Sequence, residues 1–281
     1  MARHIQGPDL RELPGMFDPS SGLIAFFAVS MLMTSVWALH LRDQDASIVD
    51  PVWGAAIWTV GVVHTLGTGA EVRGGRLLAL LLAGIWALRL GVHLHIRHGL
   101  TGEDRRYKAM REARGDSWWW KSLPVVFLLQ AALAWVVALP LMALGSGPVS
   151  VDWLTGAGFG LAFLGFLFEA IADAQLARYR ELCGTGAITD GRSGVMDQGL
   201  WGVSRHPNYF GEVVFWWGLG LAAVSAGAWW SLAGPLLITF MLLKVSGVAM
   251  TEADIAERRP GYRDYVKRVN AFVPGPRRGA R

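Results

Sequence analysis

The chain has 281 residues, of which 53% are hydrophobic and 17% charged, and its formal net charge is +4. A soluble domain carries about 25% charged residues, so this composition argues against a soluble or disordered protein and indicates a membrane protein. The single cysteine, Cys183, excludes an internal disulfide. The first twenty residues mix charges and prolines with little apolar sequence, unlike a secretory signal peptide.

Long apolar stretches recur along the whole chain. A helix needs about 20 mainly apolar residues to cross a bilayer. Seven stretches meet this requirement: 22–41, 51–68, 76–97, 122–145, 152–177, 207–226 and 228–250. The sequence therefore predicts an all-α integral membrane protein with seven transmembrane helices, forming a single transmembrane domain over residues 1–281.

The positive charges between these stretches alternate from one side to the other. Segments 97–121 and 178–205 and the tail after 252 are rich in Lys and Arg, whereas the other connections hold few. Short loops rich in Lys and Arg stay in the cytoplasm. The expected orientation has the N-terminus outside and the C-terminus inside, in a membrane expected to be the bacterial inner membrane.

Glycines within the spans allow helices to approach closely. They are Gly84 and Gly91 in the third stretch and Gly156, Gly160 and Gly165 in the fifth. We expect all five to lie at helix contacts.

Several polar residues fall where lipid-facing side chains are expected. Asp50 opens the second span, and four residues of the third span are spaced by three, four and four, which places them on one helix face. These four are Trp86, Arg89, His93 and Arg97. Charged groups at membrane depth are costly and usually line a cavity.

Two carboxylates on the fifth span have counterparts on the sixth. Glu169 and Asp173 are four residues apart, as are Asn208 and Glu212, and Lys244 and Glu252 follow on the seventh. Helix-end residues can extend to the membrane surface, and Arg97, Arg178 and Glu252 taken singly fit that interpretation. Short carboxylates cannot extend far, so we expect one polar pocket that opens to the cytoplasm.

The segment GLWGVSRHPNYFGE, residues 199–212, joins this polar set to an anion-binding signal. Pro207 suits the first turn of a helix, whose free N–H groups and positive dipole end face the preceding loop. Arg192, Arg205 and His206 stand near this helix start, as expected for a phosphate or carboxylate site. The glycine-rich loop before it lacks the third glycine and the βαβ surroundings of a dinucleotide fingerprint.

Other chemistries have little support in the sequence. His93, His95 and His98 do not share one helix face, and there is no HExxH motif and no cysteine pair, so no metal site is expected. No G-x-S-x-G motif accompanies Cys183 to indicate a nucleophile.

The stretch SRHPNYFGE, with the tail from Tyr262 to Pro274, resembles the membrane-embedded steroid 5α-reductases and, more distantly, the sterol C14- and C7-reductases. The resemblance covers the C-terminal third well and the first half weakly. Isoprenylcysteine carboxyl methyltransferases share an R-H-P-x-Y-x-G stretch, but Asn208 and Glu212 favour the reductases, in which the matching residues hold the nicotinamide carboxamide.

The resemblance implies NADPH as cofactor. Asp173 and Glu169 match residues on the adenine and ribose side, Arg178, Arg180 and Arg192 are phosphate candidates, and Lys244 lies near a family Arg. The complete expected cofactor-binding set is Arg89, Arg97, Glu169, Asp173, Arg178, Arg180, Arg192, Arg205, His206, Asn208, Tyr209, Glu212, Lys244 and Glu252.

The implied reaction is reduction of the C=C bond of an α,β-unsaturated, 3-oxo-Δ4 steroid-like ketone. A donor at the carbonyl oxygen stabilises the negative charge that develops there. The family uses a Glu on helix two and a Tyr on helix three. Asp50 resembles the Glu, whereas Trp86 occupies the position of the Tyr, which leaves Trp86, Trp53 and His93 as further catalytic candidates.

Two other functions stay open at this point. One is an S-adenosylmethionine-dependent membrane methyltransferase of the isoprenylcysteine carboxyl methyltransferase type, and the other is a lipid-binding protein or transporter. The expected partners are a lipophilic enone and membrane lipid, the latter at the basic tail. Neither nucleic acid nor a metal is expected.

Overall fold

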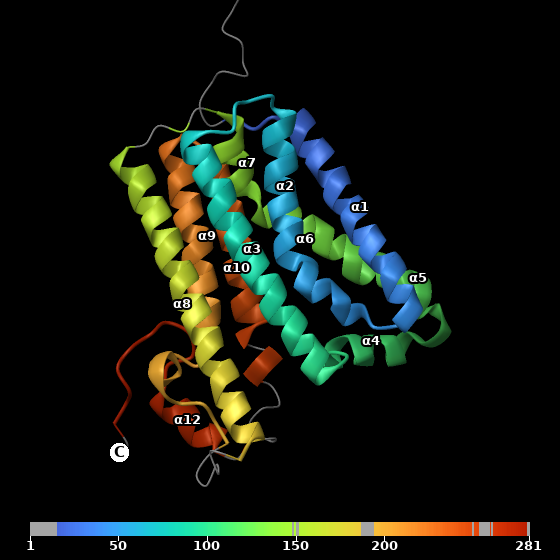
Figure 1. Ribbon diagram of the computed structural model, residues 1–281, viewed down its shortest axis with the longest axis vertical. Helices are drawn as coiled ribbons and strands as arrows, with labels where there is room; N and C mark the ends of the chain where they lie inside the picture. The colour runs from blue at the N-terminus through green and yellow to red at the C-terminus, as the bar shows by residue number, and fades with distance from the viewer. Residues whose placement is uncertain are drawn as a thin grey trace, which may run out of the picture. The chain divides into compact units, whose positions relative to one another are not determined.

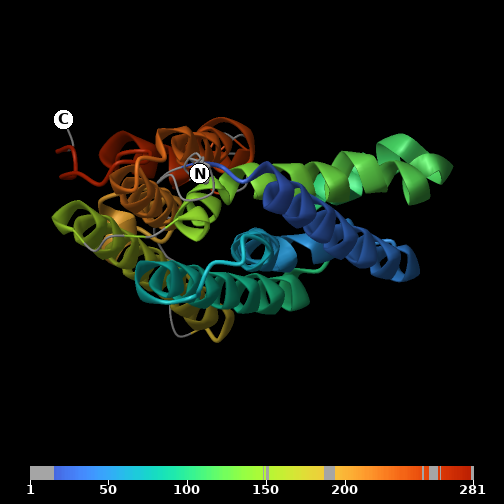
Figure 2. The same cartoon turned by 90° about the horizontal axis from the view of Figure 1, so that it is seen from above.

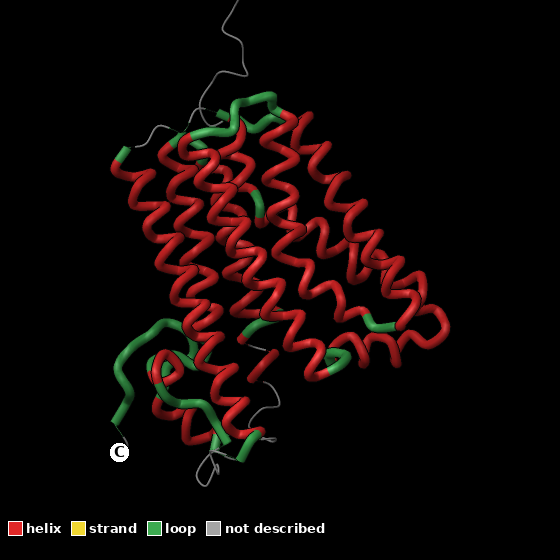
Figure 3. Tube along the Cα trace, in the orientation of Figure 1, coloured by secondary structure: helices red, strands yellow, loops and turns green. Residues whose placement is uncertain are grey.

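The computed structural model describes residues 16–147, 149, 152–186, 194–248, 250–252, 259 and 261–279. Every regular element in this part of the chain is a helix, as Figure 3 shows. The elements fall into two compact units: unit 1 comprises residues 1–159 and 219–234, and unit 2 comprises residues 160–218 and 235–281. The long helices α8 (Trp153–Gly184) and α9 (Pro207–Ser225) contribute residues to both units.

Unit 1 is built mainly from the first half of the chain (Figure 1). Its elements are α1 (Pro19–Asp43), η2 (Ala46–Val52), α2 (Trp53–Gly67), α3 (Gly74–Thr101), α4 (Arg105–Arg114), η3 (Gly115–Ser117), α5 (Trp118–Ser122), η4 (Leu123–Leu128), α6 (Leu129–Val137), α7 (Leu139–Ser146) and η6 (Trp229–Leu232). Helix α2 packs against α1, α3 and α7, and Figure 2 shows α1, α2 and α3 as neighbours. Their contact surfaces bury large apolar side chains, among them Met33, Ile57 and Trp86.

Unit 2 holds most of α8 and α9 and the C-terminal elements. These are η5 (Gly199–Gly202), α10 (Ala233–Phe240, whose first two residues belong to unit 1), η7 (Met241–Val245) and α12 (Tyr262–Arg268). Phe215 and Trp216 of α9 are fully buried, and Val195, Tyr262, Tyr265 and Val269 form a separate small core.

Aspartate caps explain where three elements of unit 1 begin. The side chains of Asp18, Asp45 and Asp104 accept hydrogen bonds from the N–H groups of Ser20, Ser47 and Arg106 at 3.1, 2.8 and 2.9 Å. Each satisfies a backbone donor that has no partner within the first helical turn. Helix α1 begins with Pro19, and α9 begins at Pro207, which confirms the helix start predicted there.

Six helical segments are long and apolar enough to cross a membrane: 19–43, 46–67, 74–100, 105–137, 153–184 and 229–252. The chain thus has the character of a multi-pass membrane protein. The remaining predicted span, 207–226, forms α9, which is not among the six because Asn208, Glu212 and their neighbours make its first turns polar. The predicted fourth span, 122–145, is interrupted at Ala138, ahead of Pro140 in the first turn of α7.

The expectation for the glycines was partly wrong. A Cβ atom at Gly84 would lie 2.9 Å from the ring of Trp58, and one at Gly91 would lie 2.9 Å from the carbonyl of Pro51. At Gly156 and Gly160, by contrast, a Cβ would meet no described atom within 4 Å. These two glycines lie on α8 but away from its contact with α9, which uses Gly165.

The crossing of α8 and α9 in unit 2 depends on two glycines. A Cβ at Gly165 would lie 2.4 Å from the backbone nitrogen of Phe215, and one at Gly211 would lie 2.5 Å from that of Glu169. Both obstacles are backbone atoms, which cannot rotate away. The two helices therefore touch along their backbones, which sets the carboxylates of α8 beside the first turns of α9.

We predict that Gly165→Ala destabilises unit 2 by about 1–3 kcal/mol, the usual cost of overpacking. The matched control is Gly160→Ala on the same helix, which should be neutral or mildly stabilising because alanine is the better helix former. Thermal unfolding of the detergent-purified variants measures both effects. Equal melting temperatures for the two variants would contradict the crossing described here.

Candidate functional site

The polar cluster of unit 1 is centred on Asp50, at the junction of η2 and α2. Its two carboxylate oxygens accept hydrogen bonds from Arg106 Nη2 at 2.9 Å and from the Tyr107 hydroxyl at 2.7 Å. Tyr107 in turn accepts from Gln130 Nε2 at 3.0 Å. Two consecutive residues of α4 thus close over Asp50, and the carboxylate acts as an acceptor to both.

A second carboxylate holds Arg106 in this position. Asp104, the cap of α4, accepts from Arg106 Nε at 2.9 Å and from Nη2 at 3.2 Å, and its own N–H donates to Ser47 Oγ at 2.7 Å. Burial opposes the ionised form of Asp104, but the hydrogen bonds and charge of Arg106 lower its pKa below the ordinary value. Asp104 is therefore a carboxylate at neutral pH and fixes the guanidinium that Asp50 shares.

Other candidates of unit 1 lie on α2 and α3. Trp53 opens α2, and Trp86 is completely buried in α3, whereas Arg89, His93 and Arg97 are partly exposed on the same helix. Each of these four α3 residues has an interaction with its surroundings.

Unit 2 brings together the predicted polar residues of α8 and α9. Asn208 Nδ2 donates to Asp173 Oδ1 at 3.1 Å, and Glu169, Asp173 and Glu212 are buried with 2%, 5% and 7% exposure. This confirms the expected neighbourhood of the two helices' polar residues. The Oδ1 atom of Asn208 is buried and has no hydrogen-bond partner among the described residues. Because the amide nitrogen is committed to Asp173, the site presents an unsatisfied acceptor.

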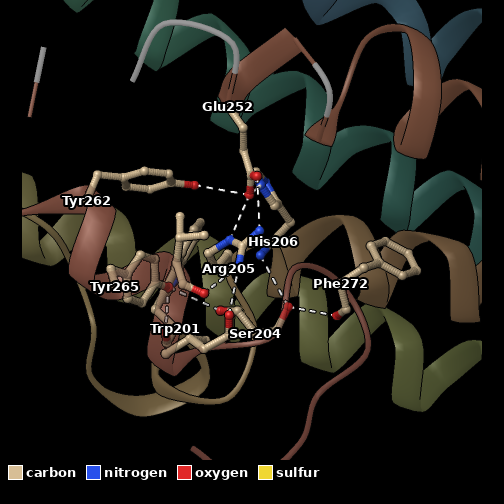
Figure 4. A network of polar contacts seen from close by, with 10 residues as sticks. Trp201, Ser204, Arg205, His206, Glu252, Tyr262, Tyr265 and Phe272 are labelled. Atoms are coloured by element: carbon tan, nitrogen blue, oxygen red, sulfur yellow. Dashed lines mark hydrogen bonds and ion pairs between the residues drawn. The ribbon is translucent and has the colours of Figure 1, made fainter. Parts of the chain in front are cut away.

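A dense network lies next to this site, at the loop that leads into α9 (Figure 4). Arg205 donates from Nε and Nη2 to the two oxygens of Glu252 at 2.7 and 3.0 Å, and His206 Nε2 lies 3.0 Å from Glu252 Oε1. The Tyr262 hydroxyl donates to the same oxygen at 3.1 Å. The predicted anion-binding residues Arg205 and His206 are thus engaged by a carboxylate of the chain itself.

Burial and charge set the protonation states in this network. Burial lowers the pKa of Arg205, but the hydrogen bonds and charge of Glu252 outweigh it and raise that pKa further above its ordinary value. Burial, followed by the negative charge of Glu252, raises the pKa of Tyr262. Burial and then Tyr262 raise the pKa of Tyr265, whose hydroxyl donates to the carbonyl of Trp201 at 2.5 Å.

The remaining predicted cofactor residues are more peripheral. Arg178 and Arg180 are exposed in the last turns of α8, where Arg178 pairs with Glu181 at 2.8 Å. Lys244 is exposed in η7, and Tyr209 stacks on His206 with ring centroids 5.5 Å apart. Arg192 lies outside the described residues. The described residues hold no group of three or more His, Cys, Asp or Glu side chains that could bind a metal.

The sequence patterns did not identify five residues of these networks: Arg106, Tyr107, Gln130, Tyr262 and Tyr265. Segment 97–121 was assigned to a cytoplasmic loop, and Arg106 was counted there only as an orientation charge. The run RRYKAMREAR did contain a signal, because Asp104 precedes it at a suitable N-cap position and Tyr107 is an aromatic residue among cations, as expected for the inward-facing side of a helix.

These features define an all-helical protein of multi-pass membrane character, with buried polar clusters in both units among the described residues. A family model described as "Protein of unknown function (DUF1295)" matches residues 36–269, and the chain belongs to this family. Neither a search of curated proteins nor one of solved structures found a match.

We predict that the two tyrosines make unit 2 sensitive to alkali. Because the pKa of Tyr262 and of Tyr265 is higher in the folded than in the unfolded state, their stabilisation is complete below about pH 10 and is lost as the pH rises further. The melting temperature of the detergent-purified protein, followed from about pH 8 to about pH 11, should fall more steeply for the wild type than for Tyr262→Phe. Parallel curves would contradict this assignment.

Proposed function

We propose that the protein is an NADPH-dependent reductase of α,β-unsaturated ketones with a 3-oxo-Δ4 steroid-like skeleton. In this proposal the chain crosses the membrane seven times, with its N-terminus outside, its C-terminus in the cytoplasm and the cofactor site accessible from the cytoplasm. Most of the residues proposed for the cofactor belong to unit 2, and the residues proposed for the substrate carbonyl, Asp50 and Tyr107, belong to unit 1.

The observation that carries the proposal is the unsatisfied acceptor on Asn208. A buried acceptor without a donor is costly, so such an atom favours a ligand that brings an N–H group. A nicotinamide carboxamide has N–H donors and a carbonyl acceptor, and the side chain of Glu212, one turn along α9, is a second acceptor for the N–H groups. The acceptors of unit 2 therefore fit the N–H groups of the carboxamide.

The charges of α8 suit the remainder of the cofactor. Arg178, which pairs with Glu181, and Arg180 are exposed at the end of this helix, where their charges suit phosphate groups, and the carboxylates of Asp173 and Glu169 suit ribose hydroxyls. Arg205 has a different role, because its guanidinium donates to Glu252 and to backbone carbonyls.

When bound, NADPH would supply the hydride for the β-carbon of the enone, and the α-carbon would then take up a proton from water. The chain's own contribution is electrostatic: once the substrate carbonyl replaces Asp50 as the acceptor, the Tyr107 hydroxyl donates its one hydrogen bond to the carbonyl oxygen, where negative charge develops. In the structure the hydroxyl donates to Asp50 and accepts from Gln130, so these two contacts hold the Tyr107 oxygen in place and the substrate has to take over the proton that Asp50 receives. Tyr107 thus supplies the phenol that is missing at Trp86, from a different helix.

Cofactor binding is tested by tryptophan fluorescence, since the chain has 14 tryptophans. The detergent-purified protein is titrated with NADPH, NADH and S-adenosylmethionine in parallel. We expect saturable binding of NADPH and weaker binding of NADH. Binding of S-adenosylmethionine alone would make the protein a methyltransferase, and no binding of any of the three would exclude both enzyme classes.

The same titration tests the role of Asn208. We predict that Asn208→Ala raises the Kd for NADPH about five- to tenfold, the effect of losing about one hydrogen bond. Glu212→Gln should also weaken binding. The matched control is Glu112→Gln, which changes an exposed glutamate of α4 in unit 1 and should leave the Kd unchanged.

A separate experiment tests Tyr107. We predict that Tyr107→Phe lowers kcat for a 3-oxo-Δ4 steroid about 100-fold, the usual effect of removing one donor to a developing oxyanion. The Kd for NADPH should not change, because the tyrosine acts on the substrate. An unchanged kcat would remove Tyr107 from the mechanism.

A further inference from the structure

Glu252 is the point at which three separate segments of unit 2 are joined. Its carboxylate accepts from Arg205 and His206 in the loop before α9 and from Tyr262 in α12 (Figure 4). Oε1 receives three of these contacts and Oε2 receives one from Arg205 Nη2. Both oxygens are therefore occupied by groups of the chain itself.

Residues 203–205 of this loop are bound to the C-terminal segment. Arg205 Nη1 donates to the carbonyls of Val266 and Val269 at 3.2 and 2.8 Å, and its backbone N–H donates to that of Asn270 at 2.9 Å. Ser204 Oγ donates to the carbonyl of Phe272 at 2.7 Å, and Gly275 N donates to that of Val203 at 3.0 Å. These hydrogen bonds hold the backbone of residues 203–205 against the C-terminal segment.

The His206 ring connects Glu252 to the first turn of α9. Its Nε2 is held by Glu252, its side chain is 4% exposed, and its face is stacked on Tyr209 with an interplanar angle of 3°. Tyr209 follows Asn208 in the first turn of α9. A rotation of the His206 ring would therefore disturb the turn that carries Asn208.

We propose that Glu252 is a positioning residue: it orients the first turn of α9 through His206 and does not itself contact the cofactor. This inference rests on the proposed function, because the site it orients is the NADPH site. It revises the cofactor-binding role expected for Glu252 and assigns the C-terminal segment to the architecture of that site.

A double-mutant cycle on NADPH affinity tests the route through His206. Glu252→Gln keeps the shape of the side chain but replaces one carboxylate oxygen, an acceptor, by an amide nitrogen that faces other donors. We expect it to raise the Kd for NADPH about tenfold, the effect of losing about one hydrogen bond to a charged group. His206→Phe keeps an aromatic ring against Tyr209 but removes the bond to Glu252. In that background the Glu252→Gln change should add less than about twofold, because contacting residues are not additive.

The control for the cycle is Asp264→Asn, an acid of α12 that is exposed and pairs with Lys267 at 2.9 Å. It should leave the Kd unchanged. If Glu252→Gln has its full effect in the His206→Phe background, Glu252 acts by direct contact and the inference is wrong.

A second readout requires no cofactor. Modification of His206 by diethylpyrocarbonate, followed by mass spectrometry, should be slow in the wild type and faster in Glu252→Gln, because the ring nitrogen loses its fixed partner. If the wild type binds no NADPH, the proposed function fails while this measurement still decides whether Glu252 holds the ring. Equal modification rates would overturn the positioning role by themselves.

Discussion

The cost of placing charge in an apolar chain governs both units. An unpaired ion in a low-dielectric interior is strongly destabilising, whereas a pair with complete hydrogen bonding is tolerated. In unit 1 the charge of Asp50 is matched by Arg106, and in unit 2 that of Arg205 is matched by Glu252. Around each pair, tyrosine hydroxyls and backbone carbonyls complete the hydrogen bonding. The helices that supply these groups are therefore held by polar contacts as well as by apolar packing.

The two polar sites of unit 2, the Glu252 network and the Asp173–Asn208 site, differ in what they leave unsatisfied. Around Glu252, the described donors of Arg205 and the hydroxyls of Tyr262 and Tyr265 all reach acceptors, so this cluster is structural in character. The Asn208 carbonyl oxygen lacks such a donor. The Asn208 oxygen can thus accept a further hydrogen bond, while the satisfied network beside it holds the first turn of α9 in place. Binding a ligand without rearrangement requires such a preorganised site.

The sequence predicted the helices well because their signals are local. Apolar length located the long helices, and Pro207 located the start of α9 within a residue. The spacing of Glu169, Asp173, Asn208 and Glu212 also predicted that α8 and α9 share a polar neighbourhood, since residues four apart lie on one face. The Asn208–Asp173 hydrogen bond bears this out.

The partners of the charged residues could not be predicted in the same way. Arg205 and Glu252 are 47 residues apart, and Asp50 and Arg106 are 56 apart, so no periodicity connects them. Arg205 fits an anion site in sequence because an arginine beside a helix start has the same appearance whether its anion is a ligand or a glutamate. Only the fold distinguishes the two. The glycines of α8 were ambiguous for a similar reason. Gly160 and Gly165 are the same residue type on the same helix, but only Gly165 faces the backbone of α9.

The π-helical element η7 affects the direction in which the side chains after it point. An α-helix advances by about 100° per residue, and a π-turn holds one residue more than an α-turn, so it shifts the angular phase of everything that follows. Glu252 lies downstream of η7, and its direction therefore depends on that extra residue as much as on its own identity. Deleting one residue within Met241–Val245 would shift the angular position of the residues that follow, including the bend at Ser246 and Gly247, and so change the direction of the carboxylate. The number of residues in this short segment thus matters for the Arg205–Glu252 contact, as does the choice of amino acid at position 252.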